Sequence, residues 1–161
     1  MVANLSLNQF EPNTPVDGMY VYMANLPQLH NVIVSSSQST ALKAGDIVVL
    51  DTASTNTNAP VALGADIDEV PFGVVTYTPM TNAFPAGERV GIARENDIIW
   101  KTADSAIAVG DAVGFKSDYT VETASPGSGD TAGLLGIALT PASAKGDLIQ
   151  VQLKFSSVTG S

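Results

Sequence analysis

The chain of 161 residues contains one histidine and no cysteine, so the side chains that most often act as nucleophiles or bind metals are scarce. A Ser-His-Asp hydrolase would have to use His30, yet the sequence has no serine with the G-x-S-x-G glycine spacing of a nucleophile elbow. A zinc site needs three or four Cys, His or carboxylate ligands, which this composition nearly excludes. We therefore interpret His30 as an ordinary surface residue or the first residue of a strand.

A second candidate is the acidic segment that contains Asp66, Asp68 and Glu69. Carboxylate oxygens are the ligands that calcium prefers, but the segment lacks the glycine and the ligand spacing of an EF-hand loop. If the segment is extended, Asp66 and Asp68 share a face and Glu69 points away. The sequence thus favours a solvated acidic loop. A carboxylate pair for glycoside hydrolysis stays possible, because such a pair meets only in the fold and the chain has 16 acidic residues.

Two further features invite a ligand. Residues 127–133 are glycine-rich like a phosphate-binding loop, but no lysine follows and no helix or preceding parallel-strand unit is predicted there. Trp100 could stack on a sugar, although a position in the core is the favoured interpretation, since aromatic residues are only 6% of the chain. The sequence therefore predicts no cofactor, no metal and no catalytic residue.

The charge balance limits the partners of this protein. Seven basic residues stand against 16 acidic ones, for a net charge of -9, and only 14% of residues are charged. Nucleic acids and anionic membranes attract basic surfaces, so both are disfavoured as partners. No apolar stretch is long enough to span a bilayer, and residues 1–6 lack the features of a secretory signal. We expect synthesis in the cytoplasm and a surface partly covered by protein partners.

The residues that could position a site are predicted to lie on strands. Val and Ile outnumber Leu, Thr is frequent, and the alternation of Ile149, Val151, Leu153 and Phe155 with polar neighbours is typical of a half-buried strand. Short turns of helix are expected only at residues 103–108 and 141–144. The predicted strands are residues 19–23, 32–35, 46–51, 72–78, 89–94, 98–101, 112–115, 120–122, 134–139 and 148–155.

A small turn unit precedes several of these strands. Glycine followed by an acid occurs at Gly45-Asp46, Gly87-Glu88, Gly110-Asp111 and Gly146-Asp147. Glycine accepts a positive φ, and the acid can accept a hydrogen bond from a nearby backbone amide. Tight turns that each lead into an apolar strand predict an all-β fold, a compact antiparallel barrel or sandwich.

The two ends differ from this body. Residues 1–17 contain prolines, asparagines and the isolated apolar residues Leu5, Leu7 and Phe10, which have no periodic segment to join. We predict an extended N-terminal arm over residues 1–17, a β-barrel domain over 18–155 and a short C-terminal tail over 156–161. Leu5, Leu7 and Phe10 are the candidate anchors of the arm.

The order of these motifs resembles that of small β-rich head proteins of tailed bacteriophages, the capsid decoration or cement proteins. The resemblance covers residues 41–155 and is carried by a series of turn and strand motifs. They begin with Ala44-Gly45-Asp46-Ile47-Val48-Val49-Leu50-Asp51 and Pro71-Phe72-Gly73-Val74-Val75, and end with Leu135-Gly136-Ile137-Ala138-Leu139 and Ala144-Lys145-Gly146-Asp147-Leu148-Ile149-Gln150-Val151.

The resemblance implies a non-enzymatic virion protein that binds the outside of the phage head. Its implied partners are the major capsid protein and two further copies of itself in a homotrimer, and its implied role is to stabilise capsomer junctions. Two other classes stay open: a fibre-head or glycan-binding attachment module, which would expose aromatic residues in a groove, and a small glycan hydrolase, which would have a pocket with a perturbed carboxylate pair.

Overall fold

The structure, a computed structural model, describes residues 15–22 and 30–161, and this part of the chain contains strands, turns and no helix. The predicted all-β class is confirmed, and the strands follow one another through short connections. In chain order they are β1 (Tyr20–Tyr22), β2 (His30–Val34), β3 (Ile47–Leu50), β4 (Val61–Gly64), β5 (Gly73–Val75), β6 (Arg89–Ala93), β7 (Ile98–Thr102), β8 (Ala112–Phe115), β9 (Val121–Thr123), β10 (Thr131–Ala138) and β11 (Leu148–Thr159).

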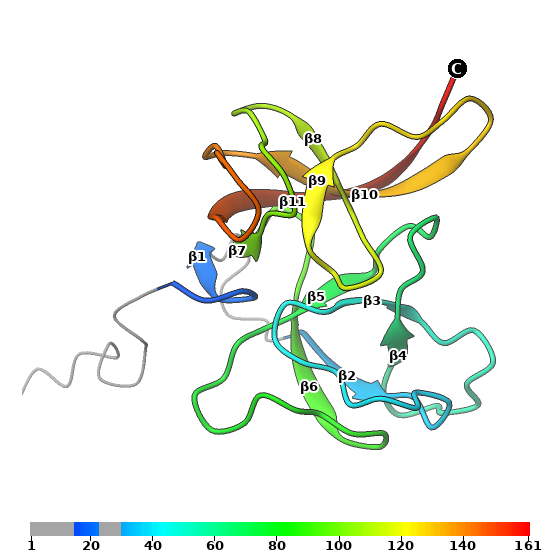
Figure 1. The fold of residues 1–161 in the computed structure, drawn as a ribbon. Helices are drawn as coiled ribbons and strands as arrows, with labels where there is room; N and C mark the ends of the chain where they lie inside the picture. Colours follow the sequence, from blue (N-terminus) through cyan, green and yellow to red (C-terminus); the bar gives the residue numbers. More distant parts are fainter. Residues whose placement is uncertain (1–14, 23–29) are drawn as a thin grey trace, which may run out of the picture.

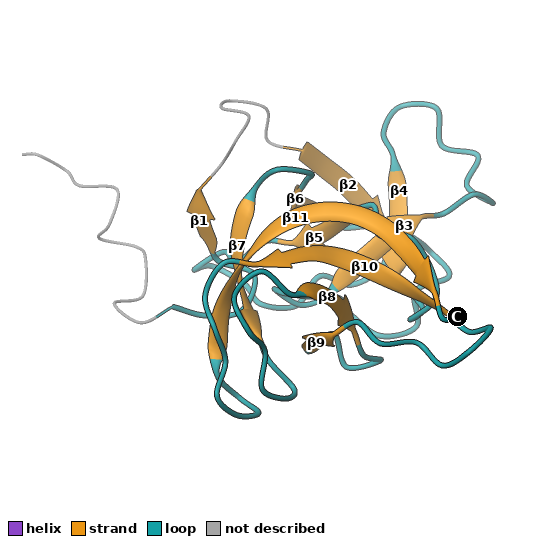
Figure 2. Cartoon of the chain, turned by 90° about the horizontal axis from the view of Figure 1, so that it is seen from above, coloured by secondary structure: helices purple, strands orange, loops and turns teal. Residues whose placement is uncertain are grey.

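The strands form two sheets that pack on each other (Figure 1). The first is a closed five-stranded barrel with the order β2-β4-β3-β5-β6. The second is an open six-stranded sheet with the order β1-β7-β11-β10-β8-β9. In Figure 2 the long, curved strands β10 and β11 extend beyond the rest of the sheet as a two-stranded ribbon. The chain therefore combines one sheet without edges and one sheet with edges.

Closure of the barrel depends on a strand that the sequence did not reveal. The short strand β4 follows a loop rich in Asn and Thr, and it ends at Gly64, so it lacks the length and pattern of a predicted strand. It pairs in parallel with β2, where Ile33 lies opposite Val61, and antiparallel with β3. The barrel is thus antiparallel except for this one pair.

The barrel strands β3, β5 and β6 form the wall that faces the open sheet, and each contributes buried side chains to both cores. In β5, Val74 points into the core between the two sheets, whereas Val75 points into the barrel. Ile47 and Val48 divide in the same way on β3. This is why these strands read as continuous apolar runs rather than as an alternation. The barrel interior contains Val32, Val34, Leu42, Val48, Ala62, Val75, Phe84, Val90 and Ile92.

The core between the sheets is the larger of the two, and it joins the barrel to the open sheet. Twelve of its buried members come from residues 99–153, and the other four, Ile47, Ala65, Val74 and Ala93, come from the barrel side. Leu135 and Leu153 are fully buried in it. Its members from the open-sheet half of the chain are Ile99, Ala103, Ile107, Val113, Phe115, Val121, Leu135, Ala138, Ala142, Ile149, Val151 and Leu153.

The predicted glycine–acid turn is present and has one geometry in both sheets. The Oδ2 atoms of Asp46, Asp111 and Asp147 each accept a hydrogen bond from the backbone amide three residues earlier, at 2.8, 3.0 and 3.0 Å. The glycine between them has a φ near +90°. At Glu88 the backbone turn is the same, with Glu88 N donating to Pro85 O, but the structure records no such bond to the side chain.

A further copy of this turn escaped the sequence pattern because asparagine stands in the place of glycine. Asn96 has a φ of 73°, and the amide of Arg94 donates to Asp97 Oδ2 at 2.8 Å. Asparagine tolerates the left-handed region better than other residues that carry a Cβ. The turn between β6 and β7, where the chain passes from the barrel to the open sheet, is therefore built like the others.

Several predicted boundaries need correction. Residues 103–108 and 141–144 form no helix; instead Ile107 and Ala142 make an antiparallel bridge, because each segment is apolar on one side and joins the sheet. Strand β11 continues to Thr159, paired with Thr131, so most of the predicted C-terminal tail belongs to the sheet. A tail could not be told from a strand here because residues 156–159 have few apolar side chains.

The predicted arm also ends earlier than residue 17. The amide of Gly18 donates to Trp100 O at 2.9 Å, and the Asp17 carboxylate contacts Lys101, so this part of the segment already joins the open sheet. Residues 1–14 lie outside the described part of the chain. The candidate anchors Leu5, Leu7 and Phe10 therefore stay predictions.

Candidate functional site

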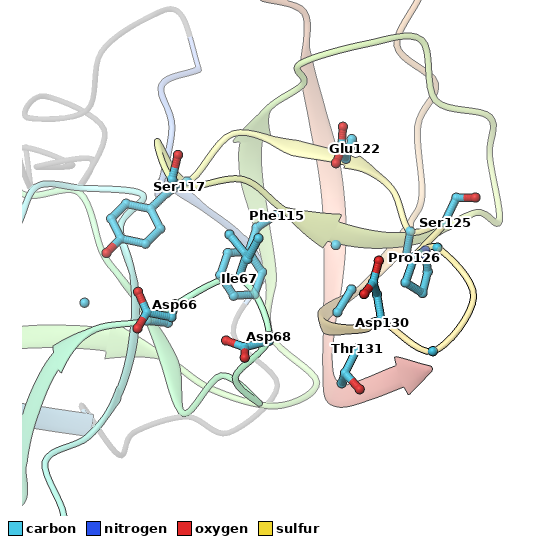
Figure 3. A pocket seen from close by; sticks show the side chains of 18 of the residues that line it. Asp66, Ile67, Asp68, Phe115, Ser117, Glu122, Ser125, Pro126, Asp130 and Thr131 are labelled. Atoms are coloured by element: carbon cyan, nitrogen blue, oxygen red, sulfur yellow. The ribbon is translucent and has the colours of Figure 1, made fainter. Parts of the chain in front are cut away.

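A groove lies between the two sheets, with the loop that follows β4 on one side and the β8–β9 hairpin and the loop that leads to β10 on the other (Figure 3). Its volume is about 930 Å³. Two apolar side chains line it: Phe115, which is 5% exposed, and Ile67, which is 52% exposed. Figure 3 shows Asp66 and Asp68 on one side of these apolar side chains, and Asp130 beside Pro126 on the other.

Two glycines allow the walls of the groove to approach each other. The amide of Gly133 on β10 donates to the carbonyl of Ile67 at 2.8 Å, and a Cβ at Gly133 would collide with the carbonyl of Glu69. At Gly64 a Cβ would collide with the hydroxyl of Tyr119. Since only glycine lets backbones come this close, these positions hold the acidic loop against the open sheet.

The groove is negatively charged. Asp66, Asp68, Glu122 and Asp130 line it, and no Lys, Arg or His does. The nearest recorded cation contact is Lys116 Nζ, 3.6 Å from Glu122. Burial raises the pKa of Tyr119, and the charges of Asp46, Asp66 and Glu69 raise it further. A surface of this sign repels phosphate, so it does not suit a nucleic acid.

In the acidic segment considered for calcium, a carboxylate binds a backbone amide of the same turn. Glu69 Oε2 accepts a hydrogen bond from the Asp66 amide at 2.8 Å, and the Glu69 amide donates to Asp66 O at 3.1 Å, which makes the segment a self-capped turn. Within residues 15–22 and 30–161, no three His, Asp or Glu side chains lie close enough to hold a metal ion. The structure thus provides no geometry for a cation in this loop.

The other residues singled out in the sequence do not converge on the groove in a catalytic arrangement. His30 is the half-buried first residue of β2 and lies opposite Ile92 on β6. Residues 127–130 form a loop that leads into strand β10 rather than into a helix, so the phosphate-loop geometry is absent there. His30 and residues 127–130 are thus parts of the sheets and their connections, and they do not form a common site.

The expectation that Trp100 belongs to the core is wrong, and the reason is a buried lysine. On β7 the buried positions are Ile99 and Lys101, whereas Trp100 is half-buried on the opposite face. Lys101 is fully buried; its Nζ donates to Gly45 O at 2.6 Å and lies 2.8 Å from Asp17 Oδ1. No local sequence signal marks Lys101, because its partners lie far away in the chain.

A second cleft, of about 640 Å³, lies at the barrel beside the loop between β3 and β4. Its lining is rich in hydroxyl and amide groups, and it has no aromatic residue. The buried Ser35 Oγ donates to Asp51 Oδ2 at 2.5 Å, and Asn56 Oδ1 accepts from the amides of Asn58 and Ala59. These groups satisfy the loop itself and leave no platform for stacking a sugar.

Apolar side chains are also exposed outside the groove. Met80, in the loop between β5 and β6, is 94% exposed, and Val109 in the turn before β8 is 62% exposed. Val70, close to Ile67 in the chain, is 50% exposed. No helix in the described residues has the length and hydropathy needed to cross a membrane. Met80, Val109 and Val70 are exposed singly, at separate places in the chain, as is normal for a protein surface.

Comparison with known proteins agrees with this description. Among solved structures, the chain is similar to the head fiber gp8.5 N base of bacteriophage phi29, with a TM-score of 0.52 and 16% sequence identity over 77% of this chain and 91% of that one. At this identity, the similarity shows a shared fold. No curated protein matches the chain.

The family model of the phage cement protein matches residues 28–153. That range includes, all or in part, ten of the eleven strands found in residues 15–22 and 30–161. The chain therefore belongs to the phage cement protein family, and it is a structural protein of the bacteriophage capsid.

Proposed function

We propose that this protein binds the outside of the phage head and bridges neighbouring copies of the major capsid protein. The family match over residues 28–153 carries the proposal. A bridge between capsid subunits exists only in the assembled shell, so its binding stabilises the shell by mass action. The proposed consequence is a head that resists the outward pressure of packaged DNA.

The proposed oligomer is a homotrimer. Only 14% of residues are charged, and apolar residues such as Met80 and Val109 are exposed, which supports contacts between protein surfaces. Three linked copies would raise the avidity for a repetitive lattice by about 10²–10⁴-fold over a single copy. Weak individual contacts would then suffice for stable decoration.

The N-terminal segment is the proposed anchor. Leu5, Leu7 and Phe10 would bury their side chains against the capsid or a neighbouring copy, either by strand addition or by simple apolar contact. Their full burial would contribute at most about 5–8 kcal/mol before the cost of ordering the segment.

The groove between the sheets supports a protein partner over nucleic acid. Its carboxylates repel phosphate, while the exposed side chain of Ile67 offers apolar contact area. We propose no catalytic activity and no cofactor, and we place synthesis in the host cytoplasm and the final position on the capsid exterior.

The direct test compares particles that contain the protein with particles that lack it. Electron cryo-microscopy should show density on the outer capsid surface only when the protein is present, at positions related by three-fold symmetry. Decorated heads should also withstand a higher temperature before they release DNA. Density inside the shell, or no density at all, would contradict the proposal.

A second candidate is an attachment module on the virion surface, and the shared fold with a head-fiber base favours it. It differs from the first candidate in what binds the exposed surface. Decoration predicts binding to empty capsids and no binding to glycans. An attachment module predicts binding to a glycan array or to host cells by the purified protein.

A further inference from the structure

Along the last part of β11, the open sheet has an edge that no described residue covers. Strand β11 pairs with β7 only from Leu148 to Gln152, and Leu153 bonds to the turn at Asn96 and Asp97. From residue 154 to Thr159, β11 pairs with β10 on one side alone. This stretch is the part of the ribbon that projects in Figures 1 and 2.

The other edges of the same sheet are shorter or partly covered. Strand β9 is covered at Val121, which forms a bridge with Ala103 and accepts a hydrogen bond from Asp104 N. Beside β1, the amide of Tyr77 donates to the carbonyl of Gly18, two residues before the strand begins. On the far side of the ribbon, β10 is held through the bond from Gly133 to Ile67. The open stretch of β11, residues 154–159, is six residues long, whereas β1 has only three residues.

The chemistry of that edge invites an added strand. After Lys154, the sequence Phe155-Ser156-Ser157-Val158-Thr159 contains no charge and no proline, which are the features that usually block edge pairing. Phe155 and Val158 are half-buried and lie beside the open backbone groups. A two-stranded ribbon gains stability from a third strand.

The N-terminal segment has the properties of that strand. Leu5 and Leu7 alternate with Asn4, Ser6 and Asn8, a period of two that gives a strand one apolar face. Residues 1–10 carry no charged side chain, so their approach to a protein of net charge -9 meets no repulsion. Residues 4–9 also match residues 154–159 in length.

The direction of the chain favours an edge on a second copy. Gly18 lies beside Trp100, which pairs with Gln150, and Asp17 contacts Lys101, which pairs with Ile149. The segment therefore enters the sheet at the end opposite residues 154–159, about 25 Å away along β11. From Pro15 it can reach up to about 36 Å to Asn4, but it would have to double back to meet its own ribbon.

We propose that residues 4–9 of one copy add as a strand to the edge of β11, residues 154–159, of a neighbouring copy. This inference rests on the self-association proposed above and specifies its contact. Repeated around a three-fold axis, the exchange closes a ring in which each copy both donates and accepts a strand.

Because the chain contains no cysteine, disulfide trapping tests the proposal cleanly. Leu5→Cys is combined with Ser156→Cys or, in a second variant, with Ser157→Cys, so that both faces of the strand are sampled. Oxidised samples of free protein and of decorated particles should give covalent dimers and trimers on a non-reducing gel. The matched control pairs Leu5→Cys with Thr55→Cys, an exposed position in the β3–β4 loop, and should stay monomeric.

Each outcome decides between interpretations. Loss of free thiols in a monomeric band shows the segment on its own ribbon and overturns the exchange between copies. A trimer in sedimentation that binds capsids but forms no crosslink in either sample also overturns it, while the proposed function stands. A protein that binds no capsid overturns the proposed function, whereas crosslinked trimers in solution would still support the exchange.

A second measurement does not depend on cysteines. Hydrogen exchange should show protected amides in residues 154–159 of the intact protein, and deletion of residues 2–10 should increase their exchange at least tenfold. Residues 47–50 of the barrel should be unaffected and serve as the internal control. Equal exchange of residues 154–159 in both proteins would overturn the proposal.

Discussion

The barrel and the open sheet are built from the same turns and the same short strands, but they differ in their edges. The barrel closes through the parallel pair of β2 and β4, so each strand has two neighbours. The open sheet ends at β1 and β9, and its longest strand continues past its neighbour β7. A closed sheet has no edge to which another chain could add, whereas an open edge can pair with a further strand, so the proposed strand exchange concerns the open sheet.

The largest expected effect comes from truncating side chains in the two cores. This tests whether the barrel and the open sheet unfold as one cooperative unit. Leu135→Ala in the core between the sheets and Leu42→Ala inside the barrel should each reduce the free energy of unfolding by about 3 kcal/mol, because each creates a cavity at a side chain no more than 1% exposed.

For both variants, denaturation should show one transition, whether followed by Trp100 fluorescence from the sheet or by circular dichroism of the whole chain. Separate transitions, with Leu42→Ala lowering only one of them, would show that the barrel unfolds independently.

The buried ion pair at the joint should give the next effect. Asp17→Ala leaves the ammonium of Lys101 buried without its carboxylate, and it should cost about 3 kcal/mol of stability, reduced where water reaches the partly exposed Asp17 site.

Lys101→Met is the matched control, because it removes the buried charge and keeps most of the volume. We expect it to cost less than Asp17→Ala in a urea titration. The opposite order would mean that the hydrogen bond from Lys101 to Gly45 O, rather than the charge pair, joins the two regions.

Two glycines with the same backbone conformation distinguish the joint from an ordinary barrel turn. Gly18 has a φ of +77°, and a Cβ there would collide with the amide nitrogen of Gly45. Gly87 has a φ of +86° and nothing within 4 Å of such a Cβ. Gly18→Ala should therefore cost more than about 2 kcal/mol, whereas Gly87→Ala should cost about 1 kcal/mol, the strain of a positive φ alone. Thermal unfolding of both variants checks the difference, and equal midpoints would contradict it.

The smallest expected effect concerns the glycine–acid turn, which occurs in both regions. The pKa of its aspartate is lowered in the open sheet and raised in the barrel. Hydrogen bonds from Ser143 and Ala144 lower the pKa of Asp147, whereas burial raises the pKa of Asp46 despite the hydrogen bond from Lys43. The stabilisation by Asp147 is present above the ordinary carboxyl pKa of 3.8 and is lost as the pH falls through its lowered pKa.

The contribution of Asp46 changes in the other direction: it declines as the pH rises from 3.8 through its raised pKa, because ionisation is then forced on a buried group. Thermal midpoints of Asp147→Asn and Asp46→Asn, measured against the unmodified protein from pH 3 to 7, should diverge from it with opposite slopes. Slopes of the same sign would show that the two turns have the same surroundings.

Local patterns in the sequence determined the all-β class, most strand positions and the glycine–acid turns. These depend on neighbouring residues: alternation sets the faces of β11, and the left-handed glycine with an acceptor one position later closes each turn. The order of the motifs was also enough for the resemblance to phage decoration proteins, which the family match confirms.

Tertiary structure decided what depends on residues far apart. Strand β4 exists because β2 and β3 supply partners for a segment with little strand character of its own. Lys101 is buried because Asp17 and Gly45 meet it from other parts of the chain, and Trp100 lies on the opposite face of β7, outside the core. The groove forms where Gly64 and Gly133 let two sheets approach, a contact that no local pattern encodes because its energy arises only when both sheets are present.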